Sequence, residues 1–342
     1  MKKIVIDCHV PFLDGVFSGF ADTVVLPPAG ITRDVVRDAD ALIVRTRTRC
    51  DASLLEGSKV TFVGTATIGM DHFDAPWLAA NGIEAVNAPG CNAPAVAQYV
   101  LASIFKVCPD PEGLTVGIVG VGHVGRIVDA WCRGLGMNTL LCDPPRALAE
   151  GPEGFWGLDE VCRRADIITF HTPHTRAPQP FPSHHLADEA FFNALCRRPV
   201  IINAARGPVV DNLALLAAMD AGKVGDCVID CWEGEPSINP VLLERATIAT
   251  PHIAGYSLQG KQRATQGVVN ALFRHFGSDR RIDLGVSDAL SAIPAKEAIT
   301  ASYDPTLDMA VMRREMASAS MSPCMFEHLR DAYPLRQEVT PD

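Results

Sequence analysis

The sequence lacks the features expected of a nucleic-acid-binding, membrane or secreted protein. It has no long basic tract, and its formal net charge is −10, which argues against a nucleic-acid or anionic-membrane surface. No uninterrupted apolar stretch is long enough to span a bilayer. The first ten residues, MKKIVIDCHV, include Asp7 and His9, which interrupt any signal-peptide core. We therefore expect a cytoplasmic protein that binds neither nucleic acid nor membrane.

A C-x-x-C pair of cysteines is also missing. The chain has eleven cysteines, scattered mostly within apolar segments, and no C-x-x-C motif. Disulfide frameworks and structural zinc sites depend on cysteines at characteristic spacings. Buried free thiols are the simpler interpretation, so we predict neither disulfides nor a metal site.

Strand-like and helix-like segments alternate along most of the chain, with no internal repeat. A length of 342 residues is long for one domain. The alternation predicts the α/β class, with a doubly wound parallel sheet (Rossmann) domain, a smaller flavodoxin-like α/β domain and a short C-terminal appendage. The predicted ranges are 1–92 and 255–278 for the smaller domain, 93–254 for the Rossmann domain and 279–342 for the appendage.

The strongest motif lies in residues 115–143. A short apolar strand is followed by Gly120, Gly122 and Gly125 at G-x-G-x-x-G spacing, then by a helical pattern and a second strand that ends at Asp143. In dinucleotide sites these glycines allow the tight turn, the approach of the pyrophosphate and close helix packing. A carboxylate about 20 residues on holds the ribose 2′-hydroxyl. Because Asp143 would repel a 2′-phosphate, we predict NAD as the cofactor, although Arg146 weakens the preference over NADP.

Three residues follow later strands, at the edge where the nicotinamide should lie: Arg206, Glu235 and His252. Oxidation of a 2-hydroxy acid needs a cation for the carboxylate, a base for the hydroxyl proton and a partner that orients the base. Arginine, histidine and a carboxylate suit these tasks. Taken singly, each residue has a structural explanation, as a surface anchor, a turn residue or a satisfied histidine. Behind a dinucleotide motif, the three together predict a catalytic set.

A second cationic group follows the predicted strand 41–44. Arg45, Arg47 and Arg49 lie on one face if the chain stays extended. Their spacing is equally compatible with a solvated edge and with a phosphate or carboxylate pocket.

The segments INAARGPVVD, DCWEGEP and TPHIAGY follow the glycine motif in the order found in the D-isomer-specific 2-hydroxyacid dehydrogenases. The sequence resembles this family over roughly residues 4–260. ADALIVRTRT, FVGTATIGMDH and APGCNAPAVAQYV extend the resemblance, which is strongest to a branch that oxidises a phosphorylated 2-hydroxy acid in pyridoxal 5′-phosphate biosynthesis.

The resemblance implies an NAD-dependent oxidoreductase in which Arg206 and Glu235 are catalytic and His252 is the proton donor and acceptor. It implies that the cofactor is bound by Gly120, Gly122, His123, Val124, Gly125, Asp143, Thr172, Ala204, Ala205, Arg206, Asp230 and Gly255. It implies that the substrate is bound by Arg45, Thr46, Thr67 and Tyr256. The family has serine where Thr46 stands, so a hydroxyl is kept, and the matching Arg45 favours the anion pocket.

The resemblance also implies a discontinuous substrate domain and a homodimer, although the C-terminal dimerisation region is shorter here than in the family. Two alternatives stay open. One is another D-2-hydroxyacid dehydrogenase, of the 3-phosphoglycerate or glyoxylate/hydroxypyruvate type. The other is a non-catalytic NAD-sensing binding protein.

Overall fold

The computed structural model describes residues 1–286 and 293–339, which form two compact units. Unit 1 comprises Met1–Asn92 and Ser257–Asp288, and unit 2 comprises Ala93–Tyr256 and Ala289–Asp342. The chain therefore crosses between the units after Asn92 and after Tyr256, and the predicted crossing after residue 254 lies two residues earlier. Of the predicted C-terminal segment 279–342, residues 287–292 and 340–342 lie outside the described residues.

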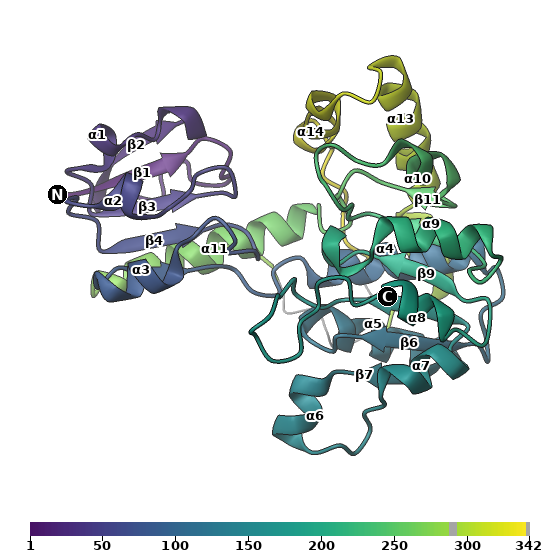
Figure 1. The fold of residues 1–342 in the computed structure, drawn as a ribbon. Coiled ribbons are helices and arrows are strands. Elements are labelled where there is room, and N and C mark those ends of the chain that lie inside the picture. Colours follow the sequence, from purple (N-terminus) through teal and green to yellow (C-terminus); the bar gives the residue numbers. More distant parts are fainter. Residues whose placement is uncertain (287–292, 340–342) are drawn as a thin grey trace. The chain divides into compact units, whose positions relative to one another are not determined.

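Unit 1 is a five-stranded parallel sheet covered by helices (Figure 1). Its strands, in the order β2-β1-β3-β4-β5, are β1 (Lys2–Asp7), β2 (Ala21–Leu26), β3 (Ala41–Val44), β4 (Phe62–Thr65) and β5 (Glu84–Val86). Its helices are η1 (Pro28–Gly30), α1 (Arg33–Val36), α2 (Ala52–Leu55), α3 (Ala75–Ala80) and α11 (Leu258–His275). One apolar core lies between the sheet and α11, and a second lies under α1, α2 and α3.

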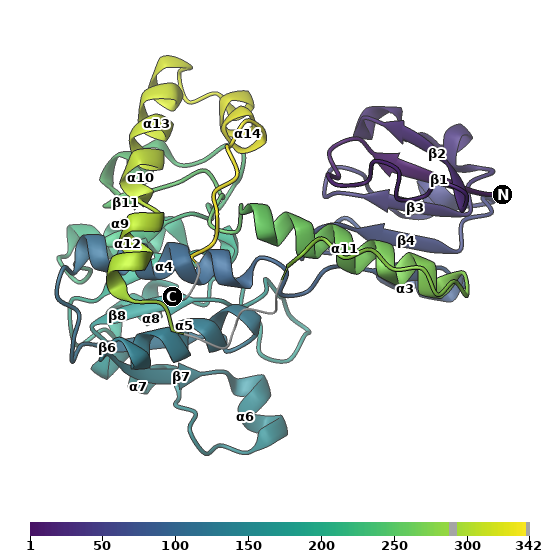
Figure 2. The ribbon, with the colours of Figure 1, turned by 180° about the vertical axis from the view of Figure 1, so that it is seen from behind.

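Helix α11 returns the chain to unit 1 and lies along β4 (Figure 2). It begins at Ser257, whose hydroxyl accepts a hydrogen bond from the backbone N–H of Gly260 and so caps the first turn. Gly64 of β4 allows the close approach, because a Cβ there would lie 2.4 Å from Cγ1 of Val268. The two sequence-distant segments of unit 1 are thus joined by direct packing.

Unit 2 is built on a six-stranded parallel sheet in the order β11-β10-β9-β8-β6-β7. The strands are β6 (Thr115–Val119), β7 (Asn138–Cys142), β8 (Ile167–Phe170), β9 (Val200–Asn203), β10 (Cys227–Ile229) and β11 (Ile248–Ala249). The helices are α4 (Ala93–Val107), α5 (His123–Gly134), α6 (Pro144–Glu150), α7 (Leu158–Arg164), α8 (Glu189–Asn193), η2 (Gly207–Val209), α9 (Asn212–Asp220), α10 (Pro240–Arg245), α12 (Lys296–Ser302), α13 (Pro305–Ser318) and α14 (Pro323–Asp331). Apolar cores on both faces confirm the predicted doubly wound fold.

The strand order of unit 2 reverses beside β6. The chain runs from β6 to β7 on one side and then crosses to β8 on the other. Loops that leave the carboxyl ends of β6 and β8 therefore diverge at this switch point, which is where open α/β sheets bind ligands.

In the described part of the C-terminal segment, residues 293–339, three helices belong to unit 2. Helix α13 packs against β11 and α4, and Met312, Met316 and Phe326 are fully buried in the core. From the sequence, only residues 324–329 of this segment predict a short helix. The longer α13 is hard to detect because Leu307 and Val311 stay exposed while the methionines are buried, so its apolar residues do not mark a single face.

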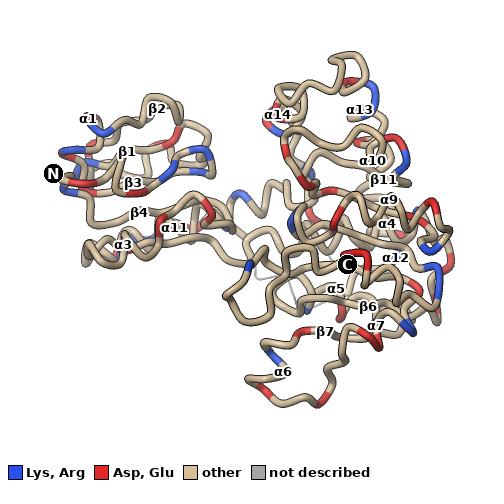
Figure 3. The backbone as a smooth tube through the Cα atoms, viewed as in Figure 1, with Lys and Arg blue, Asp and Glu red and all other residues tan. Residues whose placement is uncertain are grey.

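Lys and Arg are interspersed with Asp and Glu over both units (Figure 3). Among the described residues, no helix combines the length and apolar character needed to cross a bilayer.

Candidate active site

The glycine loop sits at the switch point of the unit 2 sheet. Gly120 has a φ of +90°, and a Cβ on it would lie 2.8 Å from the backbone nitrogen of Thr172, which follows β8. A Cβ on Gly125 would lie 2.1 Å from the carbonyl oxygen of Gly120. These two glycines are required because the loop, the helix and the neighbouring strand end pack against one another.

Gly122 has a different environment. It is the N-cap of the twelve-residue helix α5, and a Cβ placed on it meets nothing within 4 Å. The adjacent His123 is exposed, whereas Val124 is half-buried. The first turn of α5 thus presents backbone N–H groups to an open space, which is the arrangement that binds phosphates.

Thr172 supplies a hydroxyl beside this loop. Its Oγ1 is buried and has no hydrogen-bond partner in the part of the chain that the structure describes. A buried polar atom without a partner is costly. The glycine cradle and this hydroxyl together fit a dinucleotide.

Asp143 closes the other side of the glycine loop. It caps α6, where its Oδ1 accepts from the backbone N–H of Arg146 at 3.1 Å and its Oδ2 accepts from that of Val121 at 2.7 Å. The Arg146 guanidinium donates to the Val121 carbonyl at 2.8 Å and is held by both carboxylate oxygens of Glu150. The carboxylate predicted to hold the ribose is therefore fixed against the loop, and the nearby arginine is already paired.

The loops after β9 and β10 are tied together. Asn203, the last residue of β9, donates from Nδ2 to the carbonyl of Arg206 at 3.1 Å and to that of Cys231 at 3.2 Å. A Cβ on Gly207 would lie 1.8 Å from the Trp232 carbonyl oxygen. This contact leaves room only for glycine, and it fixes the loop that carries Arg206 against the segment that leads to Glu235. The loop's first residues, Ala204 and Ala205, are buried.

The predicted base and its partner are in direct contact. His252 Nδ1 and Glu235 Oε2 lie 2.7 Å apart. Because a carboxylate only accepts, Nδ1 carries the proton and donates it, which leaves Nε2 for a reactant. The side chains of His252 and Glu235 are 29% and 19% exposed, so the pair is sheltered but reachable. His252 also has a φ of +57°, a backbone strain of the kind found at functional sites.

The pair changes the pKa values of both groups. Burial works to lower the pKa of His252, but its contacts with Cys231 and Glu235 outweigh burial and raise that pKa. Burial also raises the pKa of the Cys231 thiol, which therefore stays neutral, so Glu235 supplies the negative charge. For Glu235, burial works to raise the pKa, but His252 and the backbone N–H of Trp232 lower it on balance.

Asp230 organises the segment around His252. It is 1% exposed, and its carboxylate accepts from the Thr250 hydroxyl at 2.7 Å and from the backbone N–H groups of Ile253 and Ala254 at 2.8 and 3.0 Å. Burial raises its pKa. The cofactor contact predicted for Asp230 stays a prediction; the structure shows a residue that holds the chain on both sides of His252. Gly255, which follows the buried Ile253 and Ala254, is half-buried.

Arg206 is half-buried, and its Nη1 donates to the carbonyl of Ala205. The structure thus brings Glu235 and His252 into contact and places Arg206 on a loop joined to theirs. The role of Arg206 as the carboxylate-binding residue stays a prediction.

The predicted substrate residues other than Tyr256 belong to unit 1. Arg45 and Thr46 directly follow β3, and Thr67 follows the adjacent parallel strand β4, so all three lie at the carboxyl edge of that sheet. The condition under which Arg45, Arg47 and Arg49 would share one face, an extended chain, is not met. Thr48 N–H donates to the Arg45 carbonyl at 3.2 Å, which folds the segment into a turn, and Arg49 pairs with Asp51.

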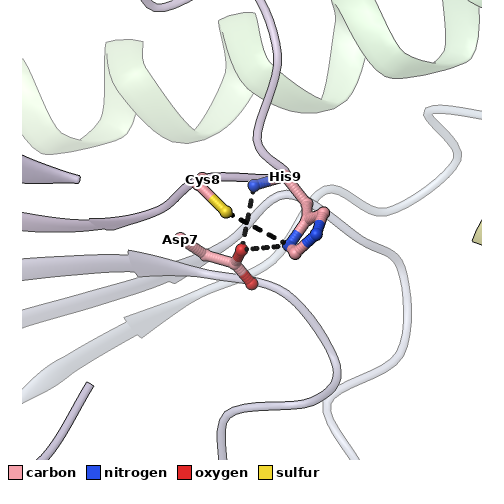
Figure 4. Close-up of side chains that lie close together, drawn as sticks. All are labelled: Asp7, Cys8 and His9. Atoms are coloured by element: carbon pink, nitrogen blue, oxygen red, sulfur yellow. Dashed lines mark hydrogen bonds and ion pairs between the residues drawn. The ribbon is translucent and has the colours of Figure 1, made fainter. Parts of the chain in front are cut away.

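Asp7 is the last residue of β1, and Cys8 and His9 follow it at the same edge (Figure 4). Oδ1 of the buried Asp7 accepts from the backbone N–H of His9 at 2.9 Å and lies 2.8 Å from its Nδ1, and the Cys8 sulfur lies 3.6 Å from that nitrogen. Their donor atoms all lie within 4.8 Å of one another, a grouping that the cysteine pattern does not predict. Asp7 fixes the turn after β1, and Cys8 lines an adjacent cavity of about 470 Å³.

Sequence reasoning missed two arginines from the C-terminal segment. Arg330 lies on α14, and its positive charge contributes to lowering the pKa of Glu235. Between the two arginines in the sequence, Tyr333 packs edge-on against Tyr256, with ring centroids 6.1 Å apart. Arg336 bonds to the backbone just after His252. Both arginines lie in the segment FEHLRDAYPLRQE, which resembles part of the family's C-terminal dimerisation region, but nothing in their spacing indicates what they contact.

Comparison with known proteins gives concordant results. Residues 101–254 match the NAD-binding domain of the D-isomer-specific 2-hydroxyacid dehydrogenases. The chain is 43% identical to an erythronate-4-phosphate dehydrogenase from Bacteroides thetaiotaomicron over 98% of this chain and 97% of that one. It is 41% identical to one from Yersinia pestis over 98% and 87% of the two chains.

A solved structure with the same fold is D-mandelate dehydrogenase from Rhodotorula graminis. It matches with a TM-score of 0.68 and 23% identity over 80% of this chain and 94% of that one. At this identity, the likeness concerns the fold alone.

Proposed function

Since the chain belongs to the erythronate-4-phosphate dehydrogenase family and is an NAD-dependent dehydrogenase, we propose that it oxidises 4-phospho-D-erythronate to 2-oxo-3-hydroxy-4-phosphobutanoate. The observation that carries this proposal is the His252–Glu235 pair, which lies beyond the strand ends of an NAD-binding unit. We infer a place in pyridoxal 5′-phosphate biosynthesis and a homodimer, the latter tested by light scattering of the purified protein.

The reaction removes a hydride from C2 of the substrate and a proton from its hydroxyl group. NAD, when bound, supplies the hydride acceptor. The glycine loop and the first turn of α5 suit the pyrophosphate, and Asp143 suits the ribose hydroxyls. These assignments rest on the open cradle at Gly122 and the unpartnered hydroxyl of Thr172.

The remaining steps belong to the chain's own side chains. Arg206 binds the C1 carboxylate through its guanidinium fork. His252 accepts the C2 hydroxyl proton at Nε2 while Nδ1 stays bonded to Glu235, whose charge stabilises the imidazolium. Arg45, with Thr46 and Thr67, binds the phosphate and supplies binding energy remote from the reacting carbon. Tyr256 completes the substrate contacts.

The test is a nicotinamide-absorbance assay of the purified chain with NAD and 4-phospho-D-erythronate, with a 2-oxo acid added to reoxidise bound NADH. D-3-Phosphoglycerate, glycerate and D-lactate form the comparison panel. A His252→Ala variant should lose on the order of 10²–10⁴-fold in turnover and still bind NAD. Preference for another acid of the panel would replace the substrate assignment. NAD binding without turnover of any acid would favour an NAD-sensing protein.

A further inference from the structure

The guanidinium of Arg336 bonds to backbone at two places far apart in the sequence. It donates to the carbonyls of Ile253 at 3.1 Å, Tyr256 at 3.3 Å and Ala95 at 3.0 Å, and also to that of Ala254. Three of these carbonyls belong to the segment immediately after His252, and the fourth lies in the first turn of α4. One side chain from the C-terminal segment therefore joins both.

The remaining polar and apolar contacts of Arg336 fix its orientation. Its Nε donates to Oε1 of Gln98 at 3.4 Å, and its guanidinium lies over the ring of Tyr303 at 4.3 Å. A planar fork with five donors can satisfy several carbonyls at once, which an ammonium cannot do with the same geometry. The arrangement is specific to arginine.

These carbonyls lie where the chain enters and leaves unit 2 and directly after His252. Ala95 lies three residues after Asn92, where the chain enters unit 2, and Tyr256 is the last residue before it leaves. Residues 253–256 also continue directly from the strained backbone of His252. Asp230 holds the N–H groups of this segment and Arg336 holds its carbonyls, so both sides of the backbone are fixed.

We propose that Arg336 is a positioning residue for His252. It holds residues 253–256 so that the imidazole keeps its contact with Glu235, and it anchors that segment to the start of α4. The C-terminal segment thereby takes part in catalysis without touching the reactants. This inference rests on the proposed role of His252 as the base.

The alternative is that Arg336 merely fastens the C-terminal segment, and Arg313 provides a matched control. Arg313, on α13, also donates to three backbone carbonyls of unit 2: Leu243 at 3.3 Å, Glu244 at 3.1 Å and Ala246 at 2.5 Å. These carbonyls lie at the end of α10. Loss of either arginine removes hydrogen bonds to backbone carbonyls of unit 2, but of the two only Arg336 contacts the segment after His252.

The experiment compares Arg336→Ala, Arg336→Lys and Arg313→Ala in the full chain by melting temperature, NAD affinity, kcat and KM. Misplacing a catalytic group by about 1 Å costs on the order of 10²-fold in rate. We expect Arg336→Ala to lose about 10- to 100-fold in kcat, a larger factor than its losses in NAD affinity or its rise in KM, and Arg336→Lys to recover only part of the loss in kcat. Arg313→Ala should lower the melting temperature and keep kcat.

Chemical rescue separates positioning from folding. Guanidinium at sub-denaturing concentration should restore part of the turnover of Arg336→Ala and none of that of His252→Ala. The proposal is overturned if Arg336→Ala keeps the kcat of the parent chain, or if Arg336→Ala and Arg313→Ala lose kcat equally. If Arg336→Ala does not fold, Arg336→Lys provides the test instead. Full kcat in Arg336→Lys would show that the planar guanidinium group is not needed to position His252, and would overturn the proposal. Inactivity of the parent chain would instead count against the proposed function.

Discussion

The imidazole of His252 donates from Nδ1 to Oε2 of Glu235 over 2.7 Å, and the two residues come from loops that follow neighbouring parallel strands, β11 and β10. The contact raises the pKa of His252 and lowers that of Glu235. An imidazole must be neutral to accept the proton of a hydroxyl group. The oxidation should therefore speed up as the pH rises through the raised pKa of His252, and the reverse reduction should be favoured at lower pH.

Glu235→Gln should move this pH dependence. The amide keeps the size of the side chain but removes the negative charge, so the pKa of His252 falls. The midpoint of the pH profile of kcat/KM for oxidation should shift to lower pH, and the maximal rate should drop because the imidazolium is less stabilised. Profiles of the parent chain and the variant, measured in the same buffers, test this. An unchanged midpoint would show that Glu235 does not set the charge state of His252.

Gly122→Ala and Gly125→Ala should separate cofactor binding from packing. A Cβ at Gly125 meets the Gly120 carbonyl oxygen at 2.1 Å, whereas one at Gly122 meets nothing within 4 Å beyond its own neighbours in the chain. Gly125→Ala should lower the melting temperature and NAD affinity together. Gly122→Ala should keep the melting temperature and lose NAD affinity, because the methyl group occupies the approach of the pyrophosphate. Calorimetry with NAD and thermal unfolding give both readouts. If Gly122→Ala bound NAD with unaltered affinity, the pyrophosphate would not bind at this loop.

Several residues of the candidate site could be placed from the sequence alone. Gly120, Gly125 and Asp143 could be placed because their roles depend on local chain geometry, which the G-x-G-x-x-G spacing and the strand pattern encode. Glu235 and His252 could be brought together because parallel strands end at one edge of a sheet.

The parts that escaped sequence reasoning depend on tertiary contacts. Strands β2 and β5 are the edges of their sheet, each with one neighbour, and their short segments show no clear buried pattern. Residues 45–48 form a turn rather than an extended segment because of one backbone hydrogen bond, from Thr48 N–H to the Arg45 carbonyl. Arg336 lies 84 residues after His252, and no periodicity relates such distant positions.

Arg45→Ala tests the phosphate site at the edge of the unit 1 sheet. A charged hydrogen bond is worth about 1.5–3 kcal/mol, so kcat/KM for 4-phospho-D-erythronate should fall about 10- to 100-fold. For non-phosphorylated D-erythronate it should change little. Arg49→Ala is the control on the same turn, because Arg49 is exposed and already pairs with Asp51 at 2.6 Å. Equal losses of kcat/KM on both substrates would show that Arg45 does not bind the phosphate.

Helix α11 and strand β4, on which it packs, offer two alanine substitutions with opposite expected effects on the stability of unit 1. Gly267 is exposed in the helix interior, and a Cβ there meets nothing within 4 Å. Gly267→Ala should therefore raise the free energy of unfolding by about 1 kcal/mol, because alanine restricts the unfolded chain and favours the helix. Gly64→Ala places its methyl group 2.4 Å from Cγ1 of Val268 on the facing side of the same helix. Overpacking of this kind costs about 1–3 kcal/mol, so this variant should unfold at lower denaturant concentration than the parent chain. If Gly64→Ala were as stable as the parent, the close packing of α11 on β4 would not contribute to the core of unit 1.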